Sequence, residues 1–535
     1  MSKMKHWLNT SALAALAALS ACSTYEADPA SIGVIVGDSL YVALSIDVRG
    51  TQAVTRANPN GGEEGDGWEY GRTYENQLHN FTVFVLGNEA DANAPAGTRF
   101  AGSRYFSDAE VAAADSLHEV ELKLKSYDVL KDVTTYDFTI PIIRGRQDRM
   151  PAPETYCFIV VANNGDLTNT YSTLGELRDA QPNVTWTPTS DGPTRFVMAN
   201  EDDQYYAHGE GSEQNPIRLH VTIERMAARI DFDPKGGELV EGALRYSVPG
   251  SDAANPLAYL YLDRAAIVNG CERPSYYIKR VADDFSGTNL TYLGDETPTP
   301  RGEATNFVID PYSTQKNEDN RTNTTLLTQL FGSSRIANSA ALLSAAGSQL
   351  PTITSLSSAV TLGYVNENTF APEMALSEYA TGVALQCRYL PNHDVYSAYD
   401  AESDALTEGT LTLGQTFYMV EPNQQEVSEA DRLYFTTLAA AEAYATATGH
   451  NHFGKVTEYT GGVCYYYVYM RHSNKVEVVH NTMEFGIVRN NIYRFSLQPA
   501  TGPGTPTADP RHPEELKARV YVRKWLSVEH PVIYV

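Results

Sequence analysis

The most regular pattern of apolar and polar residues lies near the start of the chain, between Leu40 and Val48. Every second position there is apolar, with smaller or polar residues between; the apolar positions are Leu40, Val42, Leu44, Ile46 and Val48. Because successive side chains of a β-strand point to opposite faces, all of these lie on one face. The pattern predicts a strand whose apolar face is buried.

A polar, glycine-rich loop follows this strand from Gly50 to Gly67. Its apolar content is too low to order it, and exposed loops of this kind are preferred sites of proteolysis. We hypothesise that cleavage between Arg56 and Ala57 frees the strand and empties a groove, which the strand of another subunit then fills. The alternative is an ordinary edge strand followed by a surface loop.

Short strands dominate the rest of the chain, in two groups separated by a polar interval from Asn200 to Asn215. The first group includes Asn80–Gly87, Thr135–Ile143 and Tyr156–Ala162, and the second opens with the alternating segment Ile217–Phe232. Many short strands bounded by turn residues are typical of β-sandwiches. The sequence therefore predicts an all-β protein with two β-sandwich domains and a few short helices.

Helices are predicted at Asp108–Ala114 and Thr173–Asp179, and a longer one at Leu433–Thr448, which is rich in Ala and Glu. Long polar loops are expected at Asp283–Glu303 and Ser313–Thr324. The further strands predicted in the second domain are Ala258–Leu262, Ala265–Val268, Ser275–Val281, Asn306–Ile309, Ala384–Tyr389, Thr410–Tyr418, Val463–Met470 and Ile492–Leu497.

A second apolar strand is predicted at the C-terminal end, in the segment Leu516–Val535 that follows a proline-rich spacer. Its apolar face consists of Val520, Val522, Leu526 and Val528, interrupted only by Lys524. Exposed hydrophobic strands recruit other chains, so this strand requires a docking place. Folding back into its own domain and donation to another subunit are both open.

The first residues resemble a bacterial export signal. Lys3 and Lys5 precede an apolar run, and Leu19-Ser20-Ala21-Cys22 resembles a lipobox, in which the cysteine carries lipid. The run is too short to span a membrane, and we find no other stretch of about 20 apolar residues. The predicted segments are a lipoprotein signal peptide (1–21), a propeptide with the strand to be displaced (22–56), an N-terminal sandwich (57–216), a C-terminal sandwich (217–497), a proline-rich linker (498–515) and a donor strand (516–535).

Composition narrows the possible partners. The net charge is −26 and the isoelectric point about 4.8, which argues against nucleic acid as a partner because phosphate backbones require clustered Lys and Arg.

Apart from Cys22, the chain has four cysteines: Cys157, Cys271, Cys387 and Cys464. Exported thiols can pair, whereas a cysteine inside a strand is commonly a small buried apolar residue, and both alternatives stay open.

Motifs for catalysis or ligand binding are weak. Gly449–Lys455 has P-loop spacing, but Val456 stands where a hydroxyl should hold magnesium, and a helix is expected before it. His450 and His452 have no third metal ligand at a familiar spacing, and the acidic loop Gly61–Gly67 lacks the ligand order of an EF-hand. The sequence predicts no enzyme, no cofactor and no metal site.

Several segments together resemble fimbrillins, the type V pilus subunits of anaerobic Gram-negative (Bacteroidales-type) bacteria, most of all the shaft subunit of short (minor) fimbriae. They are the lipobox at Cys22, the strand before Arg56, Val221–Ile230, Gly461–Tyr466, Val488–Tyr493 and Val520–Trp525. The run Val-Arg-Asn-Asn-Ile-Tyr at Val488–Tyr493 is the most specific of them. The loops between these segments match poorly.

The resemblance implies two transthyretin-like β-sandwich domains and assembly by donor-strand exchange. A precursor lipidated at Cys22 would pass the signal peptidase for lipoproteins and be cut between Arg56 and Ala57 by an arginine-specific, gingipain-like protease. The strand at Leu40–Val48 would leave, and the C-terminal strand of a neighbouring subunit, about Val520 to Val535, would replace it.

The implied function is that of a structural subunit of a cell-surface pilus that supports adhesion and biofilm formation. Its partners would be other fimbrillin subunits, including tip or anchor subunits, and host or bacterial surface ligands. The precursor would reside at the outer membrane and the mature form in extracellular fimbriae. The alternatives are a monomeric surface lipoprotein that acts as an adhesin or glycan-binding module, and a pilus tip subunit.

Overall fold

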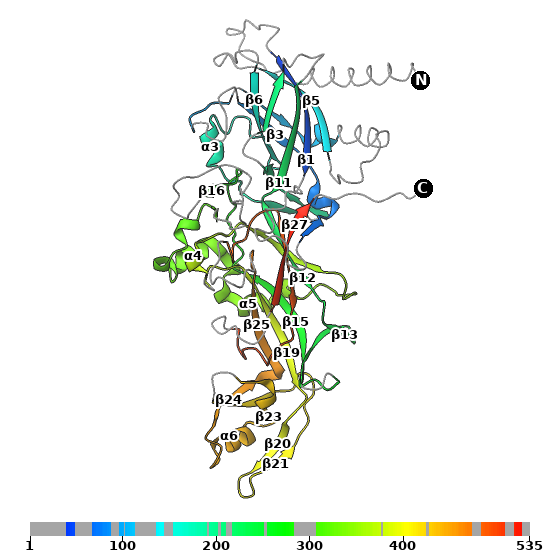
Figure 1. The fold of residues 1–535 in the computed structure, drawn as a ribbon, viewed down its shortest axis with the longest axis vertical. Helices are drawn as coiled ribbons and strands as arrows, with labels where there is room; N and C mark the ends of the chain where they lie inside the picture. Colours follow the sequence, from blue (N-terminus) through cyan, green and yellow to red (C-terminus); the bar gives the residue numbers. More distant parts are fainter. Residues whose placement is uncertain are drawn as a thin grey trace, which may run out of the picture.

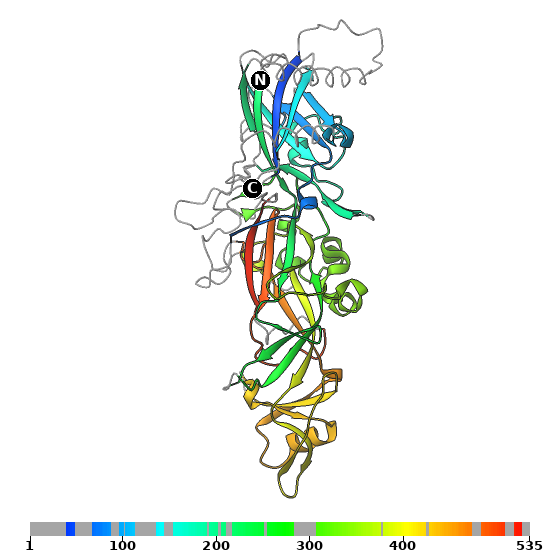
Figure 2. The ribbon, with the colours of Figure 1, turned by 90° about the vertical axis from the view of Figure 1, so that its right-hand side faces the viewer.

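A computed structural model gives a mainly β protein that extends along one axis (Figures 1 and 2), which confirms the all-β fold class predicted from the sequence. The residues that it describes are 39–48, 67–86, 96–100, 102–112, 135–143, 154–189, 192–201, 205–209, 217–250, 254–282, 307–375, 378–423, 427–472, 483–508 and 518–526. Within these residues, no helix combines the length and the apolar character needed to cross a bilayer.

The N-terminal domain is built around one sheet with the order β4-β3-β6-β9-β11-β1-β5, and β10 also pairs with β6. Its strands are β1 (Ser39–Val48), β3 (Phe81–Leu86), β4 (Gly102–Phe106), β5 (Thr135–Ile143), β6 (Glu154–Ala162), β9 (Met198–Asn200), β10 (Tyr205–Gly209) and β11 (Ile217–Arg225). Strand β3 divides its side chains between two hydrophobic clusters, with Phe81 and Val83 in one and Phe84 and Leu86 in the other. Because both of its faces are buried, all of its residues except Thr82 are apolar.

Small elements complete this domain: η1 (Thr73–Asn76), α3 (Leu174–Arg178) and the hairpin β7 (Trp186–Thr189) with β8 (Gly192–Phe196). The two short helices predicted here are present, since α3 lies within the predicted range and residues 108–112 are helical. Thr173 begins α3 as the capping residue: its side chain accepts a hydrogen bond from the backbone N–H of Glu176 at 3.2 Å.

The chain passes from the first domain to the second near Met226, later than the sequence predicts. Strand β11 belongs to the N-terminal sheet, whereas β12 (Ala227–Asp233) belongs to a different sheet. The predicted strand Ile217–Phe232 is therefore divided, and the domain boundary expected before residue 217 is corrected. Since both halves are rich in buried residues, their pattern carries no sign of the change of sheet.

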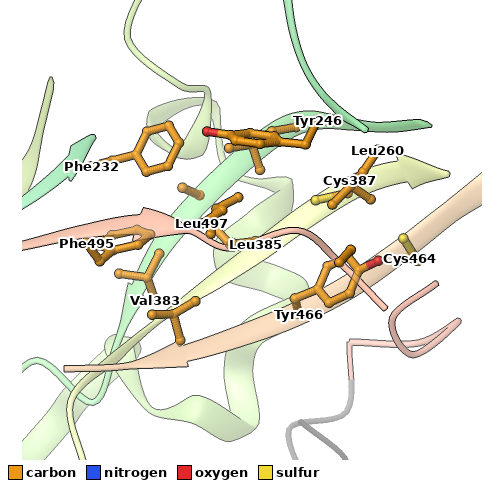
Figure 3. Packing of buried hydrophobic residues seen from close by; sticks show 14 of the residues in the cluster. Phe232, Tyr246, Leu260, Val383, Leu385, Cys387, Cys464, Tyr466, Phe495 and Leu497 are labelled. Atoms are coloured by element: carbon orange, nitrogen blue, oxygen red, sulfur yellow. The ribbon is translucent and has the colours of Figure 1, made fainter. Parts of the chain in front are cut away.

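The second domain has two sheets of five strands, in the orders β18-β12-β26-β27-β2 and β13-β14-β15-β19-β25. Their further strands are β2 (Gly67–Tyr70), β13 (Glu238–Val240), β14 (Ala243–Val248), β15 (Ala258–Val268), β18 (Val360–Asn366), β19 (Gly382–Pro391), β25 (Val463–Tyr469), β26 (Asn491–Leu497) and β27 (Ala518–Leu526). Phe232 and Phe495 of the first sheet share one core with Leu385 and Tyr466 of the second (Figure 3). The two sheets therefore form a sandwich.

A third unit, which the sequence analysis did not predict, lies at the end of the molecule away from the N-terminal sheet (Figures 1 and 2). It is inserted between β19 and β25 and consists of β20 (Val395–Asp400), β21 (Ala405–Glu408), β22 (Phe417–Pro422), β23 (Leu433–Phe435), α6 (Leu438–Thr446) and β24 (Phe453–Tyr459). The helix predicted at Leu433–Thr448 is thus shorter, because its first residues form β23, which pairs with β20 and β22. The strand predicted at Thr410–Tyr418 begins only at Phe417.

Other predictions for the second domain need correction. The two strands predicted at Ala258–Leu262 and Ala265–Val268 are one strand, β15, with an irregularity between Leu262 and Arg264. Ser275–Val281 is not a strand except at its end, where β16 (Val281–Ala282) pairs with β17 (Phe307–Val308). Helices missed by the sequence analysis are α4 (Thr324–Phe331), α5 (Ser339–Ser344) and the short 3-10 helices η2 (Ser313–Gln315), η3 (Glu318–Asn320), η4 (Gly332–Ser334), η5 (Ile336–Asn338), η6 (Ala346–Ser348), η7 (Pro372–Met374), η8 (Glu429–Asp431) and η9 (Thr460–Gly462).

We expect Phe495→Ala to lower the free energy of unfolding by about 3–5 kcal/mol, because its removal leaves a cavity in the core between the sheets. Phe495 is fully buried, and its ring centroid lies 5.3 Å from that of Phe232. Leu413→Ala, at a position that is 36% exposed, should cost less than about 1 kcal/mol. Urea unfolding followed by tryptophan fluorescence measures both; equal losses would contradict this assignment of the core.

Candidate assembly site

Strand β1 is an interior strand of the N-terminal sheet, with a neighbour on each side (Figure 1). It runs parallel to β11, pairing Val42–Val48 with Ile217–Ile223. It runs antiparallel to β5, pairing Ser39–Asp47 with Thr135–Ile143. Both edges of β1 are therefore used over most of its length.

The apolar positions predicted for the displaced strand all lie in β1: Leu40, Val42, Leu44, Ile46 and Val48. Ile46 is fully buried in the same hydrophobic cluster as Val221 and Ile223 of β11. Among the described residues, β5 pairs with no strand other than β1. Loss of β1 would expose main-chain donors and acceptors on β11 and would separate β5 from the sheet.

The chain leaves β1 after Val48 and is next described at Gly67, the first residue of β2. The predicted cleavage site Arg56–Ala57 lies between these points, outside the described residues, as does the predicted lipidation site Cys22. A cut between Val48 and Gly67 would leave β1 attached to the domain by non-covalent contacts alone.

The predicted donor strand lies in a sheet of its own subunit. Strand β27 is antiparallel to β26 over Ala518–Lys524 and parallel to β2 over Arg523–Leu526. Val520 is 3% exposed and belongs to the core of the second domain. Val522 and Leu526 are also in β27, whereas Val528 lies outside the described residues. Of the two alternatives for this strand, the folded-back one is present in the unprocessed chain, and β27 and β1 are in different sheets.

Two of the fimbrillin-like segments, Val221–Ile230 and Val488–Tyr493, meet where the domains join. The fully buried Arg225 donates from Nε to the backbone oxygen of Glu75 at 2.7 Å and from Nη1 to Oδ1 of Asn490 at 2.8 Å. The backbone N–H of Asn490 donates to the carbonyl of Ala227 at 2.8 Å. A single arginine thus joins the end of β11, η1 and the turn before β26.

A buried ion network lies next to this arginine. Arg229 Nη1 lies 2.8 Å from Oε2 of Glu75, and its Nε and Nη2 each donate to the carboxylate of Asp231 at 3.0 Å. The hydroxyl of Tyr364 donates to Oε1 of Glu75 at 2.6 Å. Burial alone would raise the pKa of Asp231, but Arg229 lowers it below its ordinary value. This carboxyl group is therefore charged in the folded protein at neutral pH.

Two further buried ion pairs lie in the same region. Arg489 binds both carboxylate oxygens of Glu367, at 2.9 and 2.7 Å, and donates to the backbone oxygen of Tyr277 at 3.0 Å. Lys279 lies 2.8 Å from the carboxylate of Glu224, which is in β11 of the N-terminal sheet. Although burial would raise the pKa of Glu367, Arg489 lowers it. The Lys279–Glu224 pair ties the second domain to the strand that borders β1, and the Arg489–Glu367 pair joins segments within the second domain.

The sequence analysis did not predict the acidic partners of this junction, although the positions of Arg225 and Arg229 indicate that buried ion pairs are present. Arginine is rarely buried without a partner, so two arginines inside a strongly apolar alternating segment indicate buried ion pairs. The partners could not be named, because Glu75 lies 154 residues from Arg229 and Glu367 lies 122 residues from Arg489.

His472 is buried against the same segment. Its Nδ1 lies 2.9 Å from the hydroxyl of Tyr493, and this hydroxyl accepts from the backbone N–H of Val488 at 2.8 Å. Burial, with the positive charge of Lys279 adding to it, lowers the pKa of His472 to about 4. His472 is therefore neutral in the folded protein at neutral pH.

The segment Gly461–Tyr466 covers the end of η9 and the start of β25. Gly461 and Gly462 have φ angles of 62° and 69°, in the left-handed region that favours glycine. Cys464 pairs in register with Cys387 of β19 (Figure 3). All four described cysteines are buried free thiols, and burial raises the pKa of Cys464 to about 12.

The weak motif at Gly449–Lys455 covers the turn after α6 and the first residues of β24. His450 Nε2 lies 3.3 Å from Asp404, and its ring centroid lies 4.1 Å from that of Tyr444. The ring of His452 lies tilted by 40° against that of Phe453, with 4.3 Å between their centroids. The two histidines thus take part in aromatic contacts of the third unit. Over the described part of the chain, no three His, Cys, Asp or Glu side chains are grouped as a metal site requires.

A comparison with family models finds one match, over residues 457–532, to a model described as major fimbrial subunit protein type IV, fimbrillin, C-terminal. The C-terminal part of this chain is fimbrillin-like. The matched range contains three of the segments on which the predicted resemblance rests: Gly461–Tyr466, Val488–Tyr493 and Val520–Trp525. A search of curated proteins found no match.

Solved structures are also similar over most of their length. A protein of Parabacteroides distasonis ATCC 8503 with a proposed role in cell adhesion is 12% identical, with 91% of this chain and 100% of that chain covered and a TM-score of 0.38. A fimbrilin of Porphyromonas gingivalis W83 is 12% identical, with 91% and 99% covered and a TM-score of 0.34. The tip fimbrial protein Mfa3 of the same species is 10% identical, with 91% and 100% covered and a TM-score of 0.31. At TM-scores below 0.5 we draw no conclusion from these structures.

We expect Arg229→Met to cost about 3–5 kcal/mol of unfolding free energy, since it removes the cation that Glu75 and Asp231 share, two buried carboxylates of which Asp231 keeps Arg494 at 3.1 Å. Arg321→Met removes ion pairs of an arginine that is 40% exposed and should cost less than about 1 kcal/mol. Thermal and urea unfolding compare the two variants. Similar small losses would show that the junction does not depend on this network.

The free energy of unfolding should fall as the pH is lowered from about 6.5 to about 4, because over this range the unfolded chain binds a proton at His472 and the folded chain does not. The pKa of His472 is lower in the folded state than in the unfolded state. The corresponding stabilisation is therefore fully present above pH 6.5 and is lost as the pH falls toward the folded pKa of about 4. The difference corresponds to about 3 kcal/mol. Urea unfolding at several pH values should show this loss reduced in His472→Gln and unchanged in His452→Gln, a substitution at an exposed position.

Proposed function

We propose that this chain is a structural subunit of a cell-surface pilus that polymerises by donor-strand exchange after proteolysis. One observation carries the proposal: an interior strand of the N-terminal sheet, β1, is supplied by a segment upstream of the polar, glycine-rich stretch in which the sequence predicts cleavage. An interior strand that can be removed leaves a groove with main-chain partners on both sides. Such a groove binds an extended segment by β-strand addition.

The pairing of the two terminal strands favours the exchange. In β1 both edges are paired over most of the strand, whereas among the described residues β27 has partners on both edges only at Arg523 and Lys524. A strand that moves from the position of β27 to the position of β1 in a neighbour therefore gains main-chain hydrogen bonds. Apolar side chains on one face, such as Val520 and Val522, would then fill the places left by those of β1.

Export and processing follow from the N-terminal motifs. The precursor is lipidated at Cys22 after the action of the signal peptidase for lipoproteins, and an arginine-specific, gingipain-like protease cuts between Arg56 and Ala57. The mature subunit is part of an extracellular fimbria together with other copies and with tip or anchor subunits. In this position it supports adhesion to host or bacterial surfaces and biofilm formation.

A second candidate function is that of a monomeric surface lipoprotein that acts as an adhesin or glycan-binding module. The observation that favours it is the docking of β27 in its own subunit, since this position requires no second subunit. In that case, loss of residues 516–535 would weaken the domain and leave the oligomeric state unchanged.

Treatment of the purified full chain with an arginine-specific protease should give a product that begins at Ala57 and forms a ladder on unboiled gels. Arg56→Ala should abolish both the product and the ladder, because β1 then stays joined to the domain. Arg49→Ala is the matched control, since Arg49 directly follows β1, and it should behave like the unaltered chain. A cut chain that stays monomeric, or an Arg56→Ala variant that polymerises equally well, would contradict the proposal.

A further inference from the structure

Strand β2 covers the strand that the proposed function assigns as donor. Among the strands that the structure describes, it is the outermost of its sheet and pairs only with β27, from Gly67 opposite Arg523 to Tyr70 opposite Leu526. On its other edge β27 pairs with β26. The two ladders overlap at Arg523 and Lys524, so β27 lies between β26 and β2 in the sheet and cannot leave it while β2 is in place.

The same strand follows directly on the predicted cleavage loop. Residues 49–66 connect the end of β1 to the start of β2, and the predicted cut after Arg56 divides this connection. Before the cut, the upstream anchor of β2 is β1, which is fixed in the N-terminal sheet by partners on both sides. After the cut and the loss of β1, β2 becomes the first strand of the chain.

The downstream anchor of β2 does not depend on processing. Arg72 donates from its backbone N–H to Oε2 of Glu75 at 2.6 Å, and from Nη2 to Oγ1 of Thr361 in β18 at 3.0 Å. Glu75 is in turn paired with Arg229 at 2.8 Å in the buried network. Processing thus changes one end of β2 and leaves the other end fixed.

We propose that β2 is a latch, which holds the C-terminal strand in its own subunit until the N-terminal segment has been removed. The inference rests on the proposed function, because it concerns the release of the same donor. A parallel ladder of four residues at the edge of a sheet is weak. A strand with a free end frays, whereas the pairing of a strand anchored at both ends re-forms readily, because its ends stay close to the sheet. Cleavage at one end of the chain thereby loosens the strand at the other end.

Hydrogen exchange tests the latch directly, on peptides that cover Arg523–Leu526. The three proteins compared are the full chain, the chain cut after Arg56 and kept too dilute to polymerise, and the full chain with Trp68→Gly and Tyr70→Gly. We expect the last two to exchange about tenfold faster than the first, since fraying or glycine substitution opens the β2 ladder. Leu239→Gly in the edge strand β13 is the matched control and should leave these peptides unchanged.

Equal exchange rates in all three proteins would overturn the latch. The proposed function is judged separately, from whether the cut chain polymerises when it is concentrated. Polymerisation with unchanged exchange would remove the latch and keep the function, whereas faster exchange without polymer would keep the latch and remove the function.

A covalent lock gives a second test if the glycine variant does not fold. Glu69→Cys and Trp525→Cys stand opposite each other in the register of β2 and β27. When these cysteines are oxidised to a disulfide, the cut chain should polymerise only after a reducing agent is added. The same lock in β13 and β14, at Glu238→Cys and Arg245→Cys, should not affect polymerisation. Polymerisation of the oxidised β2–β27 variant at the unlocked rate would contradict the proposal.

Discussion

Main-chain hydrogen bonding on both edges of β1 is the constraint on which the rest of the structure depends. The loss of an edge strand breaks one hydrogen-bond ladder, whereas the loss of β1 breaks two, one with β11 and one with β5. Its loss leaves unpaired N–H and C=O groups on two strands, and buried groups of this kind require new partners. The N-terminal sheet is therefore complete only when some strand occupies this position. A pilus subunit would use this need for a partner as its means of assembly.

The junction between the domains keeps the two relevant sheets in a fixed relation. The chain runs from β11, which borders β1, directly into β12, and three buried arginines, Arg225, Arg229 and Arg489, hold the surrounding segments together. Buried ion pairs contribute little net stability when compared with apolar packing, but breaking one is costly. A network of this kind therefore specifies one arrangement of the domains. In a filament under tension, this network would transmit force from the groove in a subunit's N-terminal sheet to the second domain, whose C-terminal strand is held by the next subunit.

Much of the fold follows from local patterns, and the exceptions have identifiable causes. The alternation at Leu40–Val48 and Thr135–Ile143 predicts β1 and β5 closely, because a strand with one buried face has a period of two. At Leu433–Phe435, pairing with β20 and β22 overrides the helical preference of the residues that follow. The division of Ile217–Phe232 between two sheets leaves no trace in the pattern. The acidic partners of the junction were not predictable either, since ion pairs between residues more than a hundred positions apart depend on the finished fold.

The most direct measurement is a disulfide between two separately prepared subunits. One carries Thr222→Cys in β11, opposite Asp47 of β1, and the other carries single cysteines along the C-terminal strand from Val520 to Val528. After both have been cut and mixed, the account predicts a mixed disulfide between β11 of one subunit and the C-terminal strand of the other, at the position that lies opposite residue 222 and not at positions four or more residues away, and none before the cut. A polymer that forms without such a disulfide would show that the place of β1 is filled in another way, and would contradict the account.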